Sequence, residues 1–307
     1  MTAFVRRMSG REQLLSPWLR EALFGYLCLT PWLVGFMAFT AGPMLASLGL
    51  SLLNTNLLTT SEFVGLKWYY DILFVDRLAT KALVNTAYYT FAMVPLATAF
   101  ALGIAILLNQ GIKLQSLWRM IYYLPSVASG VAVSLLWWWL YHPEVGLINS
   151  LLADVGIKGP KWIYSEQWAM PSLIIMALWG SGSAMLIFLA GLRSIPTALY
   201  EAAEMDGAGP FRSFWHITIP MLTPTILFNV VMNIIGSFQV FDQAFILTSG
   251  GPNNATLTMV LYIYRKAFQQ SYFGYGSALA WTLFVVTLVF SLIAIRTSRY
   301  WVYYTGE

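Results

Sequence analysis

Groups that could do chemistry are few in this chain, and most of the polar ones lie inside long apolar stretches. Amides, hydroxyls and an indole ring can hydrogen-bond to, or stack on, a neutral solute, but none of them is an acid or a base at neutral pH. In one apolar stretch such groups fall on one side of a helix at 100° per residue, and a second set reaches similar depth in the stretch before it. The two sets are Asn229, Asn233, Gly236, Ser237, Gln239 and Gln243, and Trp179, Gly180 and Ser183.

Two interpretations of these positions stay open. The first is a translocation path that offers hydrogen bonds and an aromatic face to a neutral solute such as a sugar. The second is packing, since polar residues and glycine also hold helices together in lipid. Asn233 and Ser237 fall near the middle of their stretch and are the first candidates for the path, whereas Gln243 could simply meet water at its outer mouth.

Several kinds of chemistry are not expected. The chain has no Gly-Lys-Ser or Gly-Lys-Thr, so the phosphate-binding loop of an ATPase is absent. No nucleophile stands beside a base, His142 and His216 are far apart, and Cys28 is alone, so we predict no enzyme activity, cofactor or metal site. A charge at the bilayer centre costs at least roughly 3 kcal/mol. Only Asp242 comes near a span interior, and a hydrated interface residue is its simplest interpretation, so proton coupling is not expected.

The composition is that of an integral membrane protein. The 307 residues are 58% hydrophobic and only 10% charged, against roughly 25% charged in soluble domains. A membrane-spanning helix needs roughly 20 apolar residues, and six stretches reach that length. They are residues 22–52, 82–108, 118–141, 168–192, 217–246 and 277–296. We therefore predict an all-α membrane protein with six transmembrane helices in a single domain, residues 1–307.

One long polar segment, residues 193–222, separates the fourth and fifth predicted spans. Pro196 suits the first turn of a helix. Good helix formers follow as far as Asp206, and Gly207 can adopt the left-handed conformation that ends a helix. A second helix is expected after this turn and should end or kink at Pro220. The segment is therefore predicted to be helix, sharp turn and helix, outside the hydrocarbon.

The first helix of this segment has features of a docking element. Ala202 and Ala203 make it thin, so another surface can approach closely, and Glu201 and Glu204 share a face. On physical grounds alone, an ordinary solvated loop with a charged helix is the simpler interpretation. The spacing of the residues around it favours docking.

That spacing resembles the EAA loop of the membrane subunits of bacterial ABC importers, whose pattern is Glu-Ala-Ala, three residues, Gly, nine residues, Ile, one residue, Leu and Pro. The matching residues are Glu201, Ala202, Ala203, Gly207, Ile217, Ile219 and Pro220. Only Ile219 departs from the pattern, in place of Leu. The resemblance implies a cytoplasmic coupling helix, carried by Glu201, Ala202, Ala203, Asp206 and Gly207, that docks in a cleft of a separate ATP-hydrolysing subunit.

The resemblance covers nearly the whole chain. LTSGGP, YIYRKAF and GYGSA resemble the last outer segment of sugar-type importer permeases, although Ser249 replaces a common Gly and Gly276 a common Ala. FVGLKWY, NTAYYT, LLNQGIKLQSLWRMIYYLPSV and WLYHPEVGLIN resemble the first of the two permeases in the maltose and glycerol-phosphate branch. The resemblance implies a second permease subunit, two ATP-binding subunits, an extracytoplasmic solute-binding protein and a sugar substrate. The basic residues are scattered between spans, so nucleic acid is not an expected partner.

The distribution of charge favours cytoplasmic N- and C-termini in a bacterial inner membrane. With the N-terminus inside, ten of the 17 basic residues lie on the cytoplasmic side, including Arg6, Arg7 and Arg11, and seven lie outside. The same orientation places residues 193–216 where an ATPase can reach them.

The predicted function is thus that of a permease subunit of an ATP-driven importer, moving a sugar or related neutral solute by alternating access. An ion-coupled secondary transporter is the alternative. No inverted repeat of the kind common in such proteins is visible, but a sodium site built from carbonyls would leave no sequence signal. A membrane scaffold without a path is a third possibility. Within the importer interpretation, a polyol or a glycerol phosphodiester also remains open as the solute.

Overall fold

The computed structural model describes residues 17–56 and 61–303, which are almost entirely helical. The only strands among these residues are β1 (Leu53–Asn54) and β2 (Glu62–Phe63), a short antiparallel ladder. The first part of the chain forms α2 (Pro17–Phe36), η1 (Met37–Ala41), α3 (Gly42–Leu50), α4 (Lys67–Tyr70), η2 (Asp71–Val75), α5 (Arg77–Asn109), α6 (Gln115–Val127), α7 (Gly130–Leu140) and α8 (Leu147–Asp154). The second part forms η3 (Trp162–Tyr164), α9 (Glu166–Trp179), α10 (Gly182–Arg193), α11 (Thr197–Met205), α12 (Pro210–Ser213), η4 (Phe214–Thr218), α13 (Ile219–Phe238), η5 (Ala244–Thr248), α14 (Met259–Tyr264), η6 (Arg265–Gln269) and α15 (Phe273–Ser298).

The predicted all-α architecture with six spans is confirmed, with two of the spans bent. Four helical units among the described residues are continuous and long enough to cross a membrane: Glu21–Leu50, Arg77–Asn109, Pro210–Phe238 and Phe273–Ser298. Two bent helix pairs, α6 with α7 and α9 with α10, bring the total to six when each pair counts as one span. Arg6, Arg7 and Arg11, which contribute to the predicted orientation, lie outside the described residues.

The third predicted span, 118–141, is not one straight helix. The chain turns by 100° between the end of α6 and the start of α7. Ala128, in the break, is extended with ψ of 147°, and Pro125 lacks a backbone donor in the last turn of α6. The stretch still counts as one of the six predicted spans, but its break was not predicted, because apolar composition does not record where a helix breaks.

The fourth and fifth predicted spans also differ from straight helices. The fourth, 168–192, bends by 48° between α9 and α10. The fifth, 217–246, ends at Phe238, eight residues earlier than predicted. Beyond that end, the Val240 carbonyl accepts a hydrogen bond from the Thr258 hydroxyl at 3.0 Å. A side chain from the next segment thereby satisfies backbone that left the helix, which is a requirement inside a membrane.

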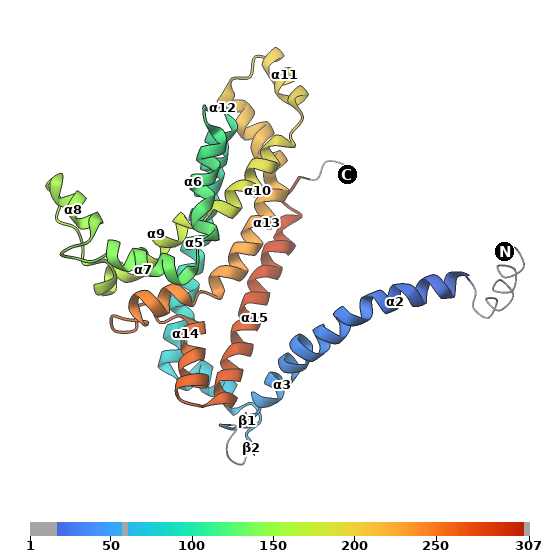
Figure 1. The fold of residues 1–307 in the computed structure, drawn as a ribbon, viewed down its shortest axis with the longest axis vertical. Helices are drawn as coiled ribbons and strands as arrows, with labels where there is room; N and C mark the ends of the chain where they lie inside the picture. The colour runs from blue at the N-terminus through green and yellow to red at the C-terminus, as the bar shows by residue number, and fades with distance from the viewer. Residues whose placement is uncertain (1–16, 57–60, 304–307) are drawn as a thin grey trace, which may run out of the picture.

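α5 is the central element of the bundle and packs against α9, α10 and α13 (Figure 1). Its buried side is a stripe of mostly small residues spaced three or four apart, the helical period. They include Ala79, Ala82, Thr86, Thr90, Ala97, Ala101 and Ala105. Small residues let membrane helices approach closely, and close packing is a main source of helix association in lipid.

α10 crosses its neighbours at two glycines. A Cβ added to Gly182 would lie 2.3 Å from the carbonyl oxygen of Tyr122 and 2.8 Å from Cα of Tyr123, both in the α6 backbone. A Cβ on Gly191 would lie 2.8 Å from Oγ1 of Thr225 in α13. The bent third and fourth spans therefore touch backbone to backbone at Gly182.

The α2 half of the first span stands apart from the bundle, whereas the α3 half packs against α15. α2 projects away from the bundle (Figure 1), and none of the described residues in the apolar part of Glu21–Leu50 is buried. Large apolar side chains such as Phe24, Trp32 and Phe39 are exposed along it. In this chain alone, the surroundings of α2 are left to lipid or to another protein.

Near β1 and β2, one carboxylate connects the start of α5 to α14 and α15. Asp76 caps α5, with Oδ1 accepting from the amides of Leu78 at 2.9 Å and Ala79 at 3.2 Å. Its Oδ2 accepts from the hydroxyls of Tyr262 at 2.5 Å and Tyr275 at 2.6 Å. Burial alone would raise the pKa of Asp76, but these hydrogen bonds outweigh burial and hold it below its ordinary value. Burial, and then the adjacent carboxylate, raise the pKa of Tyr262.

We expect Gly182→Ala to destabilise the fold, because the new methyl group cannot fit between the α6 and α10 backbones. The apparent melting temperature of the purified protein should fall by several degrees, and the folded yield should fall with it. Gly103→Ala is the matched control: it changes a glycine in a membrane helix where an added Cβ meets nothing within 4 Å. Equal losses in the two variants would contradict the close approach at Gly182.

We expect Asp76→Asn to lower the melting temperature at neutral pH, because it weakens four hydrogen bonds to a charged acceptor, each worth about 1.5–3 kcal/mol. The depressed pKa means that this stabilisation is complete above the ordinary Asp value of 3.8 and is lost as the pH falls through the lower, folded-state pKa. Asp71→Asn is the control, since no hydrogen bond to the Asp71 side chain occurs in the described part of the chain. A similar change in both variants would argue against the Asp76 connection.

Candidate functional site

The predicted docking helix is α11, which lies at one tip of the molecule (Figure 1). The left-handed turn predicted at Gly207 is confirmed, with φ of +75°. The amide of Gly207 bonds to the carbonyl of Glu204 at 3.0 Å, and the amide of Ala208 to that of Ala203 at 2.8 Å. These bonds satisfy carbonyls at the end of the helix. The conformation needs glycine, because other residues pay a steric penalty at positive φ.

The surface of α11 mixes acids with apolar groups. Glu201, Ala202, Glu204 and Asp206 are exposed, and Ala203 is half-buried; all five belong to the predicted docking segment. Next to them, the side chains of Met205 and Phe211 are 89% and 78% exposed. An exposed apolar surface rimmed by polar groups is typical of a contact with another protein.

α11 is tied to the base of the fifth span. The hydroxyls of Tyr200 and Thr218 are 2.9 Å apart, and Tyr200 packs with Ile217 and Met221 against the core formed by α5 and α10. The helix end predicted at Pro220 as one of two outcomes does not occur, since helix runs without a break from Pro210 to Phe238; a kink there stays a prediction. A π-helical turn, η4, precedes the proline, and such turns accommodate irregular hydrogen bonding inside a helix.

A cavity of about 370 Å³ lies where α5, α9, α13 and the segment after α13 meet. Its walls combine apolar side chains with six hydroxyl, amide or carboxylate groups and two glycines. The lining residues are Tyr89, Met93, Ala177, Gly180, Met232, Asn233, Gly236, Ser237, Gln239, Val240, Phe241, Asp242 and Gln243. We call this space the polar cavity.

Six of the nine residues considered for the path line the polar cavity: Gly180, Asn233, Gly236, Ser237, Gln239 and Gln243. The Asn233 Nδ2 atom is buried and has no hydrogen-bond partner among the described residues, so it is a free donor. The Ser237 hydroxyl donates to the Asn233 carbonyl at 2.5 Å. A Cβ on Gly236 would meet nothing within 4 Å, so this glycine leaves the wall open.

The other three predicted path residues do not line the polar cavity. Asn229 is buried, and its Nδ2 donates to the Thr225 carbonyl at 2.9 Å within its own helix, so its side chain serves packing. Trp179 lines a smaller hollow of about 90 Å³ beside α6 and α10, and packs edge-on against Trp137. Ser183 is exposed on the open face of α10. A path role for Trp179 and Ser183 stays a prediction.

The sequence reading missed Tyr89 altogether, since nothing distinguishes it from the other aromatic residues of an apolar span. Its hydroxyl donates to Oε1 of Gln243 at 3.0 Å. Gln239 and Gln243 do not continue the helical face of α13 as predicted, because α13 ends before them, but both line the cavity. Asp242 lies at the cavity rim, with Oδ2 3.0 Å from the position of a Cβ on Gly130, the first residue of α7.

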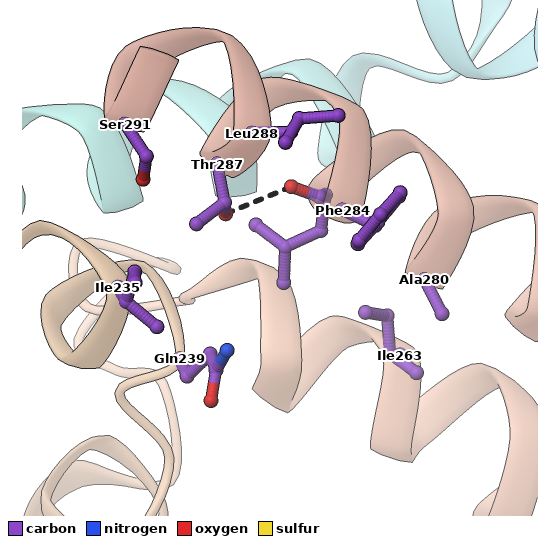
Figure 2. Close-up of a pocket in the computed structure, with 9 residues that line it drawn as sticks. Ile235, Gln239, Ile263, Ala280, Phe284, Thr287, Leu288 and Ser291 are labelled. Carbon is purple, nitrogen blue, oxygen red and sulfur yellow. Dashed lines mark hydrogen bonds between the residues drawn. The ribbon is translucent and has the colours of Figure 1, made fainter. Parts of the chain in front are cut away.

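A second hollow, of about 330 Å³, lies on the other side of α13 against α15, and Figure 2 shows it. We call it the α13–α15 groove. Its lining is mainly apolar: Ile235, Gln239, Ile263, Ala280, Leu283, Phe284, Thr287, Leu288 and Ser291. The Thr287 hydroxyl bonds to the Leu283 carbonyl at 2.9 Å, and Ser291 Oγ is buried without a partner in the described part of the chain. The groove offers few hydrogen bonds to a polar solute.

Six helical spans, an exposed helix between the fourth and fifth, and a polar cavity lined by α5, α9 and α13 are the features expected of a membrane permease subunit. Comparison with known proteins agrees. The family model described as "Binding-protein-dependent transport system inner membrane component" matches residues 93–300. The chain therefore belongs to this family of ABC importer permeases, and it is a multi-pass membrane protein.

Individual relatives cover nearly the full chain. The probable ABC transporter permease protein YesP of Bacillus subtilis (strain 168) is 40% identical over 94% of each chain. The trehalose/maltose transport system permease protein MalF of Thermococcus litoralis is 31% identical over 92% of this chain and 95% of its own. Among solved structures, a bacterial ABC transporter for the acidic polysaccharide alginate superposes with a TM-score of 0.80 at 25% identity, covering 91% of this chain and 96% of its own.

Asn229 and Asn233 share a helical face in the sequence analysis, but only Asn233 lines the polar cavity. Asn233→Ala removes a free donor from the cavity. A hydrogen bond to the solute is worth about 1 kcal/mol, so we expect its loss to raise the apparent KM for solute uptake about fivefold. Asn229→Ala, the matched control one turn away, should leave KM unchanged. Uptake by vesicles containing the assembled transporter measures both. Equal KM values for the two variants would remove Asn233 from the site.

Proposed function

We propose that this chain translocates a sugar or a related neutral solute across the bacterial inner membrane by alternating access, and that the polar cavity is its site. The observation that carries the proposal is the cavity lining, in which three amides and two hydroxyls accompany a single carboxylate, Asp242, and the donor of Asn233 has no partner among the described residues. Such groups suit hydroxyl-rich ligands, which need hydrogen bonds and apolar faces more than charge. The relative named for trehalose and maltose supports the same class of solute.

A second permease subunit completes the path. The exposed α2 and the apolar α13–α15 groove are two surfaces that this chain leaves uncovered. Helix interfaces within a membrane are enriched in small and hydroxyl residues. The α13–α15 groove contains such residues, namely Ala280, Thr287 and Ser291, so a packed partner explains it better than lipid alone. We place the second permease against these surfaces. The two chains form a heterodimer within the surrounding lipid.

Two ATP-binding subunits supply the energy, and this chain itself is not catalytic. Each permease docks one of them, here through Glu201, Ala202, Ala203, Asp206 and Gly207 on α11. Apolar Met205 and Phe211 widen the contact. An extracytoplasmic solute-binding protein, implied by the family, delivers the solute at the opposite side. No cofactor is assigned to this subunit.

The coupling follows from the connections of α11. Closure of the ATP-binding subunits moves α11, which is linked to α10 by the short segment 194–196 and to the 210–238 helix by the turn at Gly207. The Tyr200–Thr218 contact adds a second link. α10 and α13 then shift Gly180, Asn233 and Ser237 relative to α5, which opens the cavity to alternate sides. Both termini and α11 lie in the cytoplasm in this arrangement, and residues 1–307 act as one permease domain.

We expect Gly207→Val to uncouple ATP hydrolysis from uptake while the protein still inserts into the membrane. A β-branched residue costs about 1–2 kcal/mol in the left-handed conformation, so the turn should lose its shape and uptake should fall about tenfold. Gly209→Val is the matched control, because Gly209 has φ of −74° and no neighbour within 4 Å of an added Cβ. Unchanged uptake by Gly207→Val would count strongly against the coupling model.

The same vesicles distinguish the main alternative, an ion-coupled secondary transporter. In the proposed mechanism, uptake stops when ATP is depleted and does not return when a proton or sodium gradient is imposed. Uptake that persists on an ion gradient without ATP would favour the alternative instead. Crosslinking from a cysteine at position 205 to an ATP-binding subunit tests the docking directly.

A further inference from the structure

One polar contact in the polar cavity joins two elements that are far apart in the chain. Tyr89, on α5, is 3% exposed, and its hydroxyl donates to Oε1 of Gln243 at 3.0 Å. Both side chains line the cavity. With its oxygen engaged by Tyr89, the amide of Gln243 keeps its Nε2 group, which makes no hydrogen bond within the described part of the chain. The contact therefore leaves a two-hydrogen donor available to a ligand.

The hydrogen bond from Tyr89 is the only side-chain hydrogen bond that Gln243 makes among the described residues. α13 stops at Phe238, residues 239–241 are not helical, and helical backbone resumes at Asp242 and continues through Gln243 into η5. The Thr258 hydroxyl donates to the Val240 carbonyl at 3.0 Å, and Ala244 is fully buried, so the backbone around Gln243 is held in place. The Gln243 side chain itself is half-buried. The hydroxyl from α5 is therefore the contact that sets its orientation.

The side of α5 that carries Tyr89 is rigid. One turn before it, buried Thr86 accepts a hydrogen bond from the amide of Met259 at 2.8 Å, and Asn85 donates to the carbonyls of Asn254 and Leu257 at 2.9 and 3.1 Å. The loop after η5 is thus fastened to the same stretch of α5. Tyr89 is itself buried on this fixed stretch of helix, so its hydroxyl has a defined position. A defined donor position is what is needed to orient a neighbouring side chain accurately.

We propose that Tyr89 is a positioning residue for solute recognition: it fixes the Gln243 amide so that Nε2 donates to a solute hydroxyl beside the free Nδ2 of Asn233. The inference rests on the proposed function, since it takes the polar cavity as the solute site. It adds a residue from the second span to a site that the sequence placed on the fourth and fifth alone. Two amide donors in the lining of one cavity suit a ligand with several hydroxyl oxygens, as a sugar ring provides.

A double-mutant cycle tests the role, because a residue that acts through another loses its effect once that other is gone. Tyr89→Phe, Gln243→Ala and the double variant are assembled with the partner subunits in vesicles. Uptake is measured for trehalose, maltose and arabinotriose, and the sugar taken up fastest by the unaltered transporter serves for the comparison. We expect Tyr89→Phe to raise the apparent KM about fivefold with little change in maximal rate. The double variant should match Gln243→Ala alone.

Tyr141→Phe is the matched control. Tyr141 is also fully buried, and its hydroxyl donates to the Ser172 carbonyl at 2.9 Å, outside the cavity. This variant should lower thermal stability as much as Tyr89→Phe, or more, without raising KM. If Tyr89→Phe changes only stability and maximal rate, or if the Tyr89 and Gln243 effects add in the double variant, the positioning role is overturned.

Asn233→Ala, measured beside these variants, separates the two levels of the argument. A raised KM for Asn233→Ala with an unchanged KM for Tyr89→Phe overturns the inference and leaves the proposed site intact. An unchanged KM for both overturns the polar cavity as the proposed solute site and the inference with it.

Discussion

Backbone polar groups that leave a helix within the hydrocarbon must find partners there, because lipid offers none. In this protein the third and fourth spans break at 128–129 and 180–181, and the fifth ends at Phe238 and is followed by the non-helical residues 239–241. These three places lie close together. Gly180 and Gln239 line the polar cavity, and the carboxylate of Asp242, which also lines it, lies against Gly130 at the start of α7. The polar cavity therefore lies where helices end, and polar groups from these ends join those of α5 and α13 in its lining.

Broken helices need an unbroken one to hold them. α5 runs from Arg77 to Asn109 and presents a stripe of small residues to α9, α10 and α13. Hydrogen bonds at the N-terminal end of α5 hold the irregular segments in place. Asp76 accepts from Tyr262 and Tyr275, and Thr86 accepts from the amide of Met259. α5 is therefore the continuous helix against which α9, α10 and α13 pack, and the polar cavity lies between it and these helices.

Two helices connect α11, at one tip of the molecule, with the region of the polar cavity. α10 reaches from the cavity to α11 without interruption except the short segment before Pro196, and the helix from Pro210 to Phe238 returns from α11 to Asn233 and Ser237. The π-helical turn η4 lets that helix pass Pro220 without stopping. These two helices meet α11 at one end and lie beside the polar cavity at the other, which is the connection that the proposed coupling uses.

Apolar runs and their lengths were enough to establish an all-α membrane protein with six spans, because burial in hydrocarbon imposes about 20 apolar residues on each. The turn at Gly207 was equally predictable, since glycine alone adopts its positive φ without strain. The breaks were not: Ala128 and Val240 are as apolar as their neighbours, and whether a helix stops there depends on partners such as Thr258 from distant segments. Helical periodicity placed Asn229 and Asn233 on one face of a helix. In the structure, Asn229 hydrogen-bonds to the Thr225 carbonyl of its own helix, whereas Asn233 lines the polar cavity with its donor unpaired among the described residues. Tyr89 came to the site only through packing, which brings residues 154 positions apart within 3.0 Å.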